Sequence, residues 1–324
     1  MRQCRQSLQA RQLLVGIWLD QPEEACFDRI IVDVDNLLGW SGLTGFRNED
    51  EDDRIQCRWY QQQSLAAQIG QTSVRVSIGS WEVGTKLWAD RTEQSIQESA
   101  SFAVDVPEMQ SADALIREWV KPLQDLLTLA TGQACGVHRI ALRSRQRGNN
   151  TAITQRPTDV QVYLQPVYRS RADESAMPPE RMLFTLRDMQ FSDVLPSWLA
   201  VSRQLSPAPE MILGLRYIDR SFVENRLITA VAAAEALHRR LLPENTYVGD
   251  TEFEQIRSAV LDAIPEAHRA WLRGRVRNEP SFKERLMQLV ERLGAELVRV
   301  PAKSVIARAR KELLLVSSGC RFRR

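Results

Sequence analysis

Alternating hydrophobic and polar residues in the first half of the chain predict β-strands. The segment from Phe27 to Val34 alternates in this way and ends at the polar residue Asp35. The same period recurs in TSVRVSIGSW (72–81), SASFAVDVP (99–107), GVHRIALRSRQR (136–147), DVQVYLQPVY (159–168) and MLFTLRDMQF (182–191). A period of two is typical of strands that bury one face. We therefore expect a sheet in this half of the chain.

One long helix interrupts the predicted sheet. Between residues 111 and 131, apolar residues recur at helical spacing: Leu115, Trp119, Leu123, Leu126 and Ala130. Ser111 is a suitable N-cap, and Gly132 is suitable for ending the helix in a left-handed conformation. Pro122 lies inside the segment, so we expect a kink or a break there.

From about residue 195 the pattern becomes helical and remains so. PSWLAVSRQL (196–205) predicts a short helix, and the run up to Pro243 predicts a long one. The long helix carries a broad apolar stripe formed by Val223, Leu227, Ala230, Val231, Ala234, Leu237 and Leu241. Two further helices are predicted to begin with capping boxes, at Thr251 with Glu254 and at Ser281 with Glu284.

This order of elements predicts an α+β protein. We expect a β-rich N-terminal domain with one long helix over residues 1–200, then an all-α domain over 201–300. Residues 301–324 are predicted to form a basic, atypical tail, because eight basic residues and one acidic residue occur from Arg299 onward. Such a tail is either an arm for polyanions or a solvated end.

Composition limits the classes of function. The chain has 324 residues, 44% hydrophobic and 26% charged, with a net charge of +2, as in ordinary soluble proteins. The apolar runs are too short for a membrane span, so we expect a cytoplasmic protein without a membrane partner. Five scattered cysteines and three histidines argue against a zinc site. We expect no metal and no cofactor.

Local charge patterns leave several alternatives open. Arg139, Arg143 and Arg145 share one face of a predicted strand. They would either contact RNA phosphates or belong to an ordinary solvent-exposed face of the sheet. His138 shares the other face with apolar residues, so we favour a core histidine over a catalytic one. The acidic run NEDEDD (48–53) is interpreted as a solvated loop rather than a cation site.

Five spaced stretches together resemble a known family over about residues 13–297. They are FDRIIVDVDNLLGWSGL, IREWVKPLQDLLTLATG, VLPSWLAVSRQL, ENRLITAVAAAEALHRRL and LRGRVRNEPSFKERLMQLV. In this order they resemble the ApeA-type proteins of bacterial anti-phage abortive infection. The resemblance implies an N-terminal domain that senses infection and a helical HEPN domain that cuts RNA without a metal, usually as a dimer.

The HEPN ribonuclease signature is an arginine, a polar residue and, a few positions later, a histidine. The histidine acts as general acid or base, and the arginine stabilises charge on the phosphate. Here the last histidine is His268, so none follows Arg277 and Asn278. We therefore assign no catalytic residue, interpret Arg277-Asn278 as the polar start of a capped helix, and expect a catalytically inactive chain.

The family's catalytic helix is expected after about residue 300, where this chain has no histidine. Its end, GCRFRR, is typical of a shifted reading frame, and the resemblance implies that early strands of the family are missing. We therefore expect a chain truncated at both ends, with an incomplete HEPN-like bundle. Arg226 and Glu235 lie on the long helix and would either flank an RNA groove or form exposed ion pairs.

The partners expected from this resemblance are RNA, a second copy bound through the helical domain, and an unknown phage trigger. Nothing in the sequence indicates DNA. The alternative is a non-enzymatic module that binds RNA, another polyanion or a protein. A third outcome is a degraded gene product without activity.

Overall fold

The computed structural model describes residues 12–51, 54–61, 64–83, 95–144, 158–164, 176–218, 221–243 and 245–299. The chain divides into two compact units. The first comprises Met1–Val201 with Arg216–Asp219, and the second comprises Ser202–Leu215 with Arg220–Arg324. The predicted α+β class is confirmed. The predicted boundary at residue 200 lies next to Val201, after which the chain first passes from the first unit to the second. The predicted tail 301–324 lies outside the described part.

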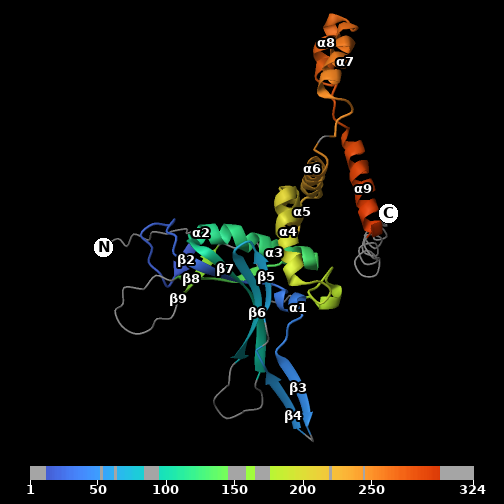
Figure 1. Ribbon diagram of the computed structural model, residues 1–324. Helices are drawn as coiled ribbons and strands as arrows, with labels where there is room; N and C mark the ends of the chain where they lie inside the picture. The colour runs from blue at the N-terminus through green and yellow to red at the C-terminus, as the bar shows by residue number, and fades with distance from the viewer. Residues whose placement is uncertain are drawn as a thin grey trace, which may run out of the picture. The chain divides into compact units, whose positions relative to one another are not determined.

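The first unit is built on a seven-stranded antiparallel sheet (Figure 1). Its order is β1-β9-β8-β2-β7-β6-β5. The strands are β1 (Gln12–Val15), β2 (Phe27–Val34), β5 (Leu65–Ile69), β6 (Thr72–Val83), β7 (Ser95–Gln110), β8 (Val137–Ser144) and β9 (Thr158–Leu164). Alternation therefore located the central strands correctly, because in each of these strands the side chains on one face of the sheet are buried.

A separate hairpin corrects one prediction from the sequence. β3 (Phe46–Glu51) pairs with β4 (Arg54–Trp59) as a two-stranded sheet. The acidic run 48–53 was interpreted as a loop, yet its first four residues belong to β3. Backbone pairing with β4, from Phe46↔Trp59 to Glu51↔Arg54, extends the strand into the charged run. Strand formation depends strongly on the partner strand, which composition does not reveal.

The predicted long helix is present, and it is divided where Pro122 led us to expect a break. It consists of α2 (Ala112–Leu115), the π-helical turn η1 (Ile116–Val120) and α3 (Lys121–Thr131). The side chain of Ser111 accepts a hydrogen bond from the Ala114 amide at 3.3 Å, which confirms the N-cap. Gly132 ends α3 with φ 68°, a conformation that favours glycine.

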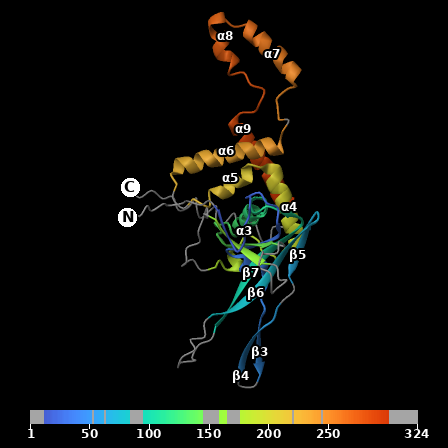
Figure 2. The same ribbon diagram turned by 90° about the vertical axis from the view of Figure 1, so that its left-hand side faces the viewer.

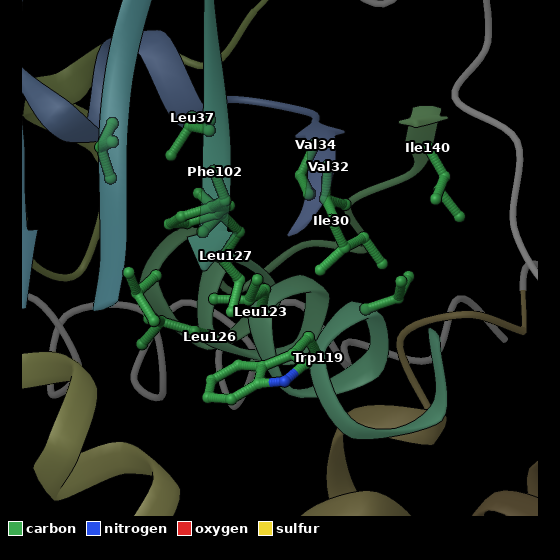
Figure 3. Packing of buried hydrophobic residues seen from close by; sticks show 14 of the residues in the cluster. Ile30, Val32, Val34, Leu37, Phe102, Trp119, Leu123, Leu126, Leu127 and Ile140 are labelled. Atoms are coloured by element: carbon green, nitrogen blue, oxygen red, sulfur yellow. The ribbon is translucent and has the colours of Figure 1, made fainter. Parts of the chain in front are cut away.

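The apolar face of α3 packs on one face of the sheet. Leu123, Leu126 and Leu127 belong to the same buried cluster as Ile30 and Phe102 (Figure 3). Burial of each such side chain stabilises the fold by about 1.5–3 kcal/mol. The core of the first unit therefore lies between α3 and strands β2 and β7.

Trp40 lies at one end of this core, on the short helix α1 (Leu37–Ser41). Its side chain is fully buried. The ring centroids of Phe102, Phe184 and Phe191 each lie 6.4 Å from the Trp40 ring, two of them edge-on. Such tilted aromatic contacts add to the stabilisation from burial.

The segment 182–190 is not the strand that its alternation predicts. It follows the 3₁₀ turn η2 (Pro179–Arg181) and forms turns up to α4. Its amides bond to the ends of helices: Leu183 donates to the Ala130 carbonyl at 2.7 Å, and Leu186 donates to the Trp40 carbonyl at 3.0 Å. The alternate apolar residues fill the core around Trp40 instead of facing one side of a sheet.

The second unit is helical. The chain enters it along α4 (Phe191–Leu205) and continues through α5 (Ala208–Gly214), α6 (Val223–Leu241), α7 (Asp250–Asp262), α8 (Glu266–Arg273) and α9 (Phe282–Arg299). α6 contacts both α5 and α9, and α7 contacts α8 (Figure 2). The predicted capping box at Thr251 is wrong, because α7 begins after Gly249 and places Thr251 inside the first turn.

The segment Arg216–Asp219 returns to the first unit between α5 and α6. The Tyr217 hydroxyl donates to Asp125 Oδ1 at 2.9 Å and lies 2.6 Å from Thr128 Oγ1. The Lys121 amine lies 4.5 Å from the centre of the Tyr217 ring. Burial raises the pKa of Tyr217, so its hydroxyl remains a hydrogen-bond donor. This segment is therefore anchored on α3.

Across the described part of the chain, none of the helices has the length and apolar character needed to cross a bilayer.

Candidate functional site

The polar face of the sheet carries Arg139 and Arg143, two of the arginines that the sequence singled out for RNA. Arg143 on β8 donates through Nε to Asp28 at 2.8 Å and through a terminal nitrogen to Asp105 at 3.4 Å. Asp105 also accepts from Arg29 at 2.5 Å and from Arg75 at 2.6 Å. Opposite charges on neighbouring strands stabilise the sheet. Arg143 is thus already engaged by two carboxylates.

Arg139 differs from Arg143 in its surroundings. Its side chain is 45% exposed, and its guanidinium lies 3.9 Å from Asp33, the limit of an ion pair. Arg145 lies outside the described residues. The assignment of RNA binding to this face stays a prediction, and Arg139 is the described member with a guanidinium open to solvent.

His138 does not lie on the apolar face, contrary to the expectation from alternation. The register passes from Asp33↔Arg139 to Val34↔Val137, so His138 is an extra residue in β8. Such a bulge turns the extra side chain away from the alternating pattern. The ring is more than half exposed and forms a short ion pair with Asp35, which raises the pKa of His138.

Arg226 and Glu235 are not brought together by α6. Nine residues of one continuous helix correspond to two and a half turns, so the two side chains leave opposite faces. Arg226 is exposed and Glu235 is half-buried. Within the described residues neither forms an ion pair, so the expected pairing with neighbours is not seen there. Their role in RNA binding stays a prediction.

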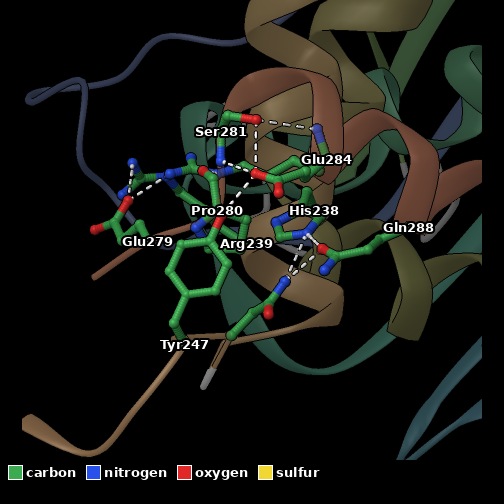
Figure 4. Close-up of polar contacts among 10 residues, drawn as sticks. His238, Arg239, Tyr247, Glu279, Pro280, Ser281, Glu284 and Gln288 are labelled. Atoms are coloured by element: carbon green, nitrogen blue, oxygen red, sulfur yellow. Dashed lines mark hydrogen bonds and ion pairs between the residues drawn. The ribbon is translucent and has the colours of Figure 1, made fainter. Parts of the chain in front are cut away.

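A polar cluster joins the end of α6 to the start of α9 (Figure 4). His238 is buried, and its Nε2 lies 2.7 Å from Gln288 Oε1 and 3.2 Å from Asn245 Nδ2. The Asn245 amide also donates to Gln288 Oε1 at 2.5 Å. The imidazole is therefore held by two neutral amides rather than by a guanidinium. No signal in the sequence linked Asn245 and Gln288 to this histidine.

Glu279 forms the charged part of the same cluster. Its carboxylate accepts from Arg285 at 2.5 Å and from Arg239 at 3.4 Å, as Figure 4 shows. Arg285 is nearly buried and also donates to the Pro280 carbonyl at 3.0 Å. These bonds hold the turn before α9 against the end of α6.

Asn278 anchors the segment that precedes α9. Its side-chain amide donates to the Val248 carbonyl at 2.8 Å, and its Oδ1 accepts from the Val248 amide at 3.2 Å. Its own carbonyl accepts from the Tyr247 amide at 3.0 Å. Arg277 beside it is exposed. Asn278 thus fixes the polar segment that leads into the capped helix, as the sequence led us to expect.

The predicted capping box at the start of α9 is confirmed. The Glu284 carboxylate accepts from the Ser281 amide at 2.8 Å and from the Ser281 hydroxyl at 2.7 Å. The Tyr247 hydroxyl donates to the same carboxylate at 2.6 Å. These donors, Tyr247 first, lower the pKa of Glu284 to about 2.

The capping box predicts a pH dependence of stability. The pKa of Glu284 is lower in the folded chain than its ordinary value of 4.5, so its stabilisation is complete above that pH. It is lost as pH falls through about 2. Glu284→Gln should therefore lower the thermal midpoint of helix unfolding at pH 6, and this difference should shrink towards pH 2. Circular dichroism measures it.

Glu291→Gln on the same helix is the matched control for this test. Glu291 is exposed and accepts no such donors in the described part of the chain. An equal pH dependence of the two variants would contradict the role of the capping box.

Within the described residues no group of three or more histidine, cysteine or acidic side chains is arranged to hold a metal ion. The cluster between α6 and α9 consists of hydrogen bonds and ion pairs among side chains and backbone groups of the protein. It can orient the two helices and present Arg239, Glu291 and Arg292 to solvent. A cavity of about 600 Å³ beside it is lined by Asn245 and Gln288 together with Leu241, Leu242, Pro243, Glu291 and Arg292.

The two units define a class of protein with an antiparallel sheet domain followed by a helical domain. Residues 2–198 match the family described as ApeA N-terminal domain 1, and residues 228–312 match the family described as Apea-like HEPN. The chain therefore belongs to the ApeA family, with the domain architecture of anti-phage abortive-infection HEPN proteins. No curated protein and no solved structure matches the chain significantly.

Proposed function

We propose that this chain is an infection-responsive member of its family that does not cleave RNA by the HEPN mechanism. Its N-terminal domain would bind a phage component, and its helical domain would pair with a second copy. The two matched domains support the assignment to phage defence. The surroundings of the three histidines support the absence of cleavage.

Cleavage of RNA by this mechanism needs an imidazole that can exchange protons beside a guanidinium that stabilises the phosphate. His138 belongs to the sheet domain and is paired with Asp35. His238 is buried and bonded to amides, so an RNA hydroxyl has no access to it. His268 is exposed on α8, eleven positions after Arg257, whereas four to six intervening residues place the histidine of the HEPN signature five to seven positions after its arginine. This distribution is the observation that carries the proposal.

Pairing of helical domains is supported by exposed apolar side chains. Val223, Leu227 and Ile228 at the start of α6 are 76%, 63% and 65% exposed. Met287 and Val290 on α9 are 53% and 63% exposed. Val223 and Leu227 belong to the broad apolar stripe that the sequence predicts on α6. Exposed apolar side chains grouped on one helix are a feature of association surfaces, and a second copy is the occupant we propose.

The purified full chain tests the proposal directly. Incubation with total cellular RNA in EDTA is expected to leave the RNA intact, and sedimentation is expected to show a dimer that Leu227→Glu dissociates. Cross-linking in phage-infected cells should join a phage protein to the N-terminal domain. RNA cleavage that disappears in His238→Ala or His268→Ala would overturn the proposal, as would cross-links confined to the helical domain.

A second candidate function is binding of RNA or another polyanion without cleavage. The exposed guanidinium groups of Arg139 and Arg226 favour it. Contacts with phosphates release counterions, so affinity should fall steeply between low and moderate salt. Affinity for RNA that is independent of salt would exclude this mode of binding.

A further inference from the structure

A groove of about 680 Å³ opens in the first unit where β2 ends and α1 begins. This volume is within the range of ligand sites in proteins. The lining includes the end of β2, residues of α1, and Glu98, Ser99 and Ala100 of β7. The apolar part of the lining includes Val34, Leu37, Leu38, Leu43, Met177 and Pro178.

Among the described residues, the part of β7 that lines the groove pairs with a neighbouring strand on one side. β2 pairs with β7 as far as Val32↔Phe102, whereas β6 continues to pair with β7 as far as Val83↔Ser95. In the described part of the chain, no strand therefore pairs with Ser95–Ser101 on the β2 side. Backbone groups at such an edge can pair with an added extended segment.

The carboxylates of the lining are not equally satisfied. Glu98 accepts from the Gly45 amide at 2.6 Å and from the Trp59 indole at 2.8 Å, so it has a structural role. Asp35 accepts from the Gly136 amide at 2.6 Å and pairs with His138. Each of these two carboxylates is therefore held by protein donors.

Asp33 differs from the other two acidic residues. Its Oδ1 is buried and has no hydrogen-bond partner within the described residues, and its Oδ2 lies 3.9 Å from Arg139. A buried carboxylate oxygen without a donor is costly. The lining contains three acidic residues, Asp33, Asp35 and Glu98. It also contains two basic residues, His138 and the exposed Arg187. The groove therefore favours a ligand that brings a cation to Asp33.

We propose that this groove binds an extended peptide segment carrying a lysine or arginine. The peptide backbone pairs with the free side of β7, and the basic side chain donates to Asp33. Apolar residues that flank the cation pack on Leu38 and Met177. The inference rests on the proposed sensing function, since it assigns to the phage trigger an exposed, basic, extended segment.

A display library of random heptapeptides, selected on the full chain, tests this inference. Selected peptides are expected to be enriched in Lys or Arg and to bind at least about 10-fold more weakly to Asp33→Asn, because a hydrogen bond to a charged group is lost. Arg187→Glu is expected to strengthen binding, because it removes a cation from the exposed margin. Hydrogen exchange at Ser99–Ser101 should slow when a peptide binds.

Glu108→Gln is the matched control, since Glu108 is exposed on the same strand but does not line the groove. It should leave peptide affinity unchanged, and thermal melts should show that all three variants fold. Selection without basic enrichment, equal affinity for the native chain and Asp33→Asn, or binding of spermidine alone would each overturn the inference. If selected peptides bind in the groove but phage protein cross-links persist in Asp33→Asn, the sensing role of the groove fails while the peptide site stands.

Discussion

Replacing Arg143 by methionine is expected to lower the free energy of unfolding of the first unit by about 3–5 kcal/mol. Arg143 donates to Asp28 at 2.8 Å and to Asp105 at 3.4 Å, and the Asp28 side chain is only 4% exposed. Methionine retains most of the apolar stem but removes the charge. The two carboxylates then remain close together with less compensation in a poorly solvated environment. Urea unfolding followed by tryptophan fluorescence measures the loss.

Arg139→Met is the control for this experiment, because Arg139 lies on the same strand, its side chain is 45% exposed, and its contact with Asp33 is long, at 3.9 Å. Its loss is expected to cost less than about 1 kcal/mol, as for exposed ion pairs. Equal losses in the two variants would contradict the structural role of Arg143. If Arg143 served mainly to contact RNA, its replacement would weaken RNA binding and leave unfolding unchanged.

Trp40→Ala is expected to destabilise the same unit by about 3–5 kcal/mol. Trp40 is fully buried and contacts the rings of Phe102, Phe184 and Phe191. Truncation to alanine leaves a cavity where three segments far apart in the sequence converge. Near-ultraviolet circular dichroism and urea unfolding report the loss of packing and of stability.

A graded comparison separates packing from hydrogen bonding at Trp40. The Trp40 indole nitrogen has no hydrogen-bond partner in the described part of the chain, so Trp40→Phe should retain much of the stability. Trp18→Ala should change stability by less than about 0.5 kcal/mol, because Trp18 is 86% exposed. A loss in Trp18→Ala comparable to that in Trp40→Ala would contradict this account of the core.

Periodicity predicted the central sheet because burial of one face constrains every second residue. β2 and β6 coincide with alternating segments, and the break in the long helix lies next to Pro122. The failures share a different cause. Segment 182–190 alternates but is bonded to helix ends, and one inserted residue turns His138 out of the predicted face. Such outcomes depend on neighbours that are distant in sequence.

The candidate sites were less predictable than the fold. The capping box at Ser281 is local, and its spacing was sufficient to find it. The contact of His238 with Gln288 joins residues fifty positions apart, and the groove combines the end of β2 with β7 and residues 176–179. A pattern within a short stretch of sequence does not predict contacts between residues so far apart, because these contacts follow from how the sheet and helices pack.

The return of Tyr217 to the first unit affects how the chain can be divided for experiments. A fragment that stops at residue 200 discards the hydroxyl that donates to Asp125 and uncovers the surface of α3 on which the ring lies. Proteolytic cleavage between α5 and α6 would likewise leave residues of the segment Arg216–Asp219, which belongs to the sheet unit, attached to helices of the other unit. Fragment boundaries that respect this path must retain Arg216–Asp219 with the sheet, even though α4 and α5 come earlier in the chain.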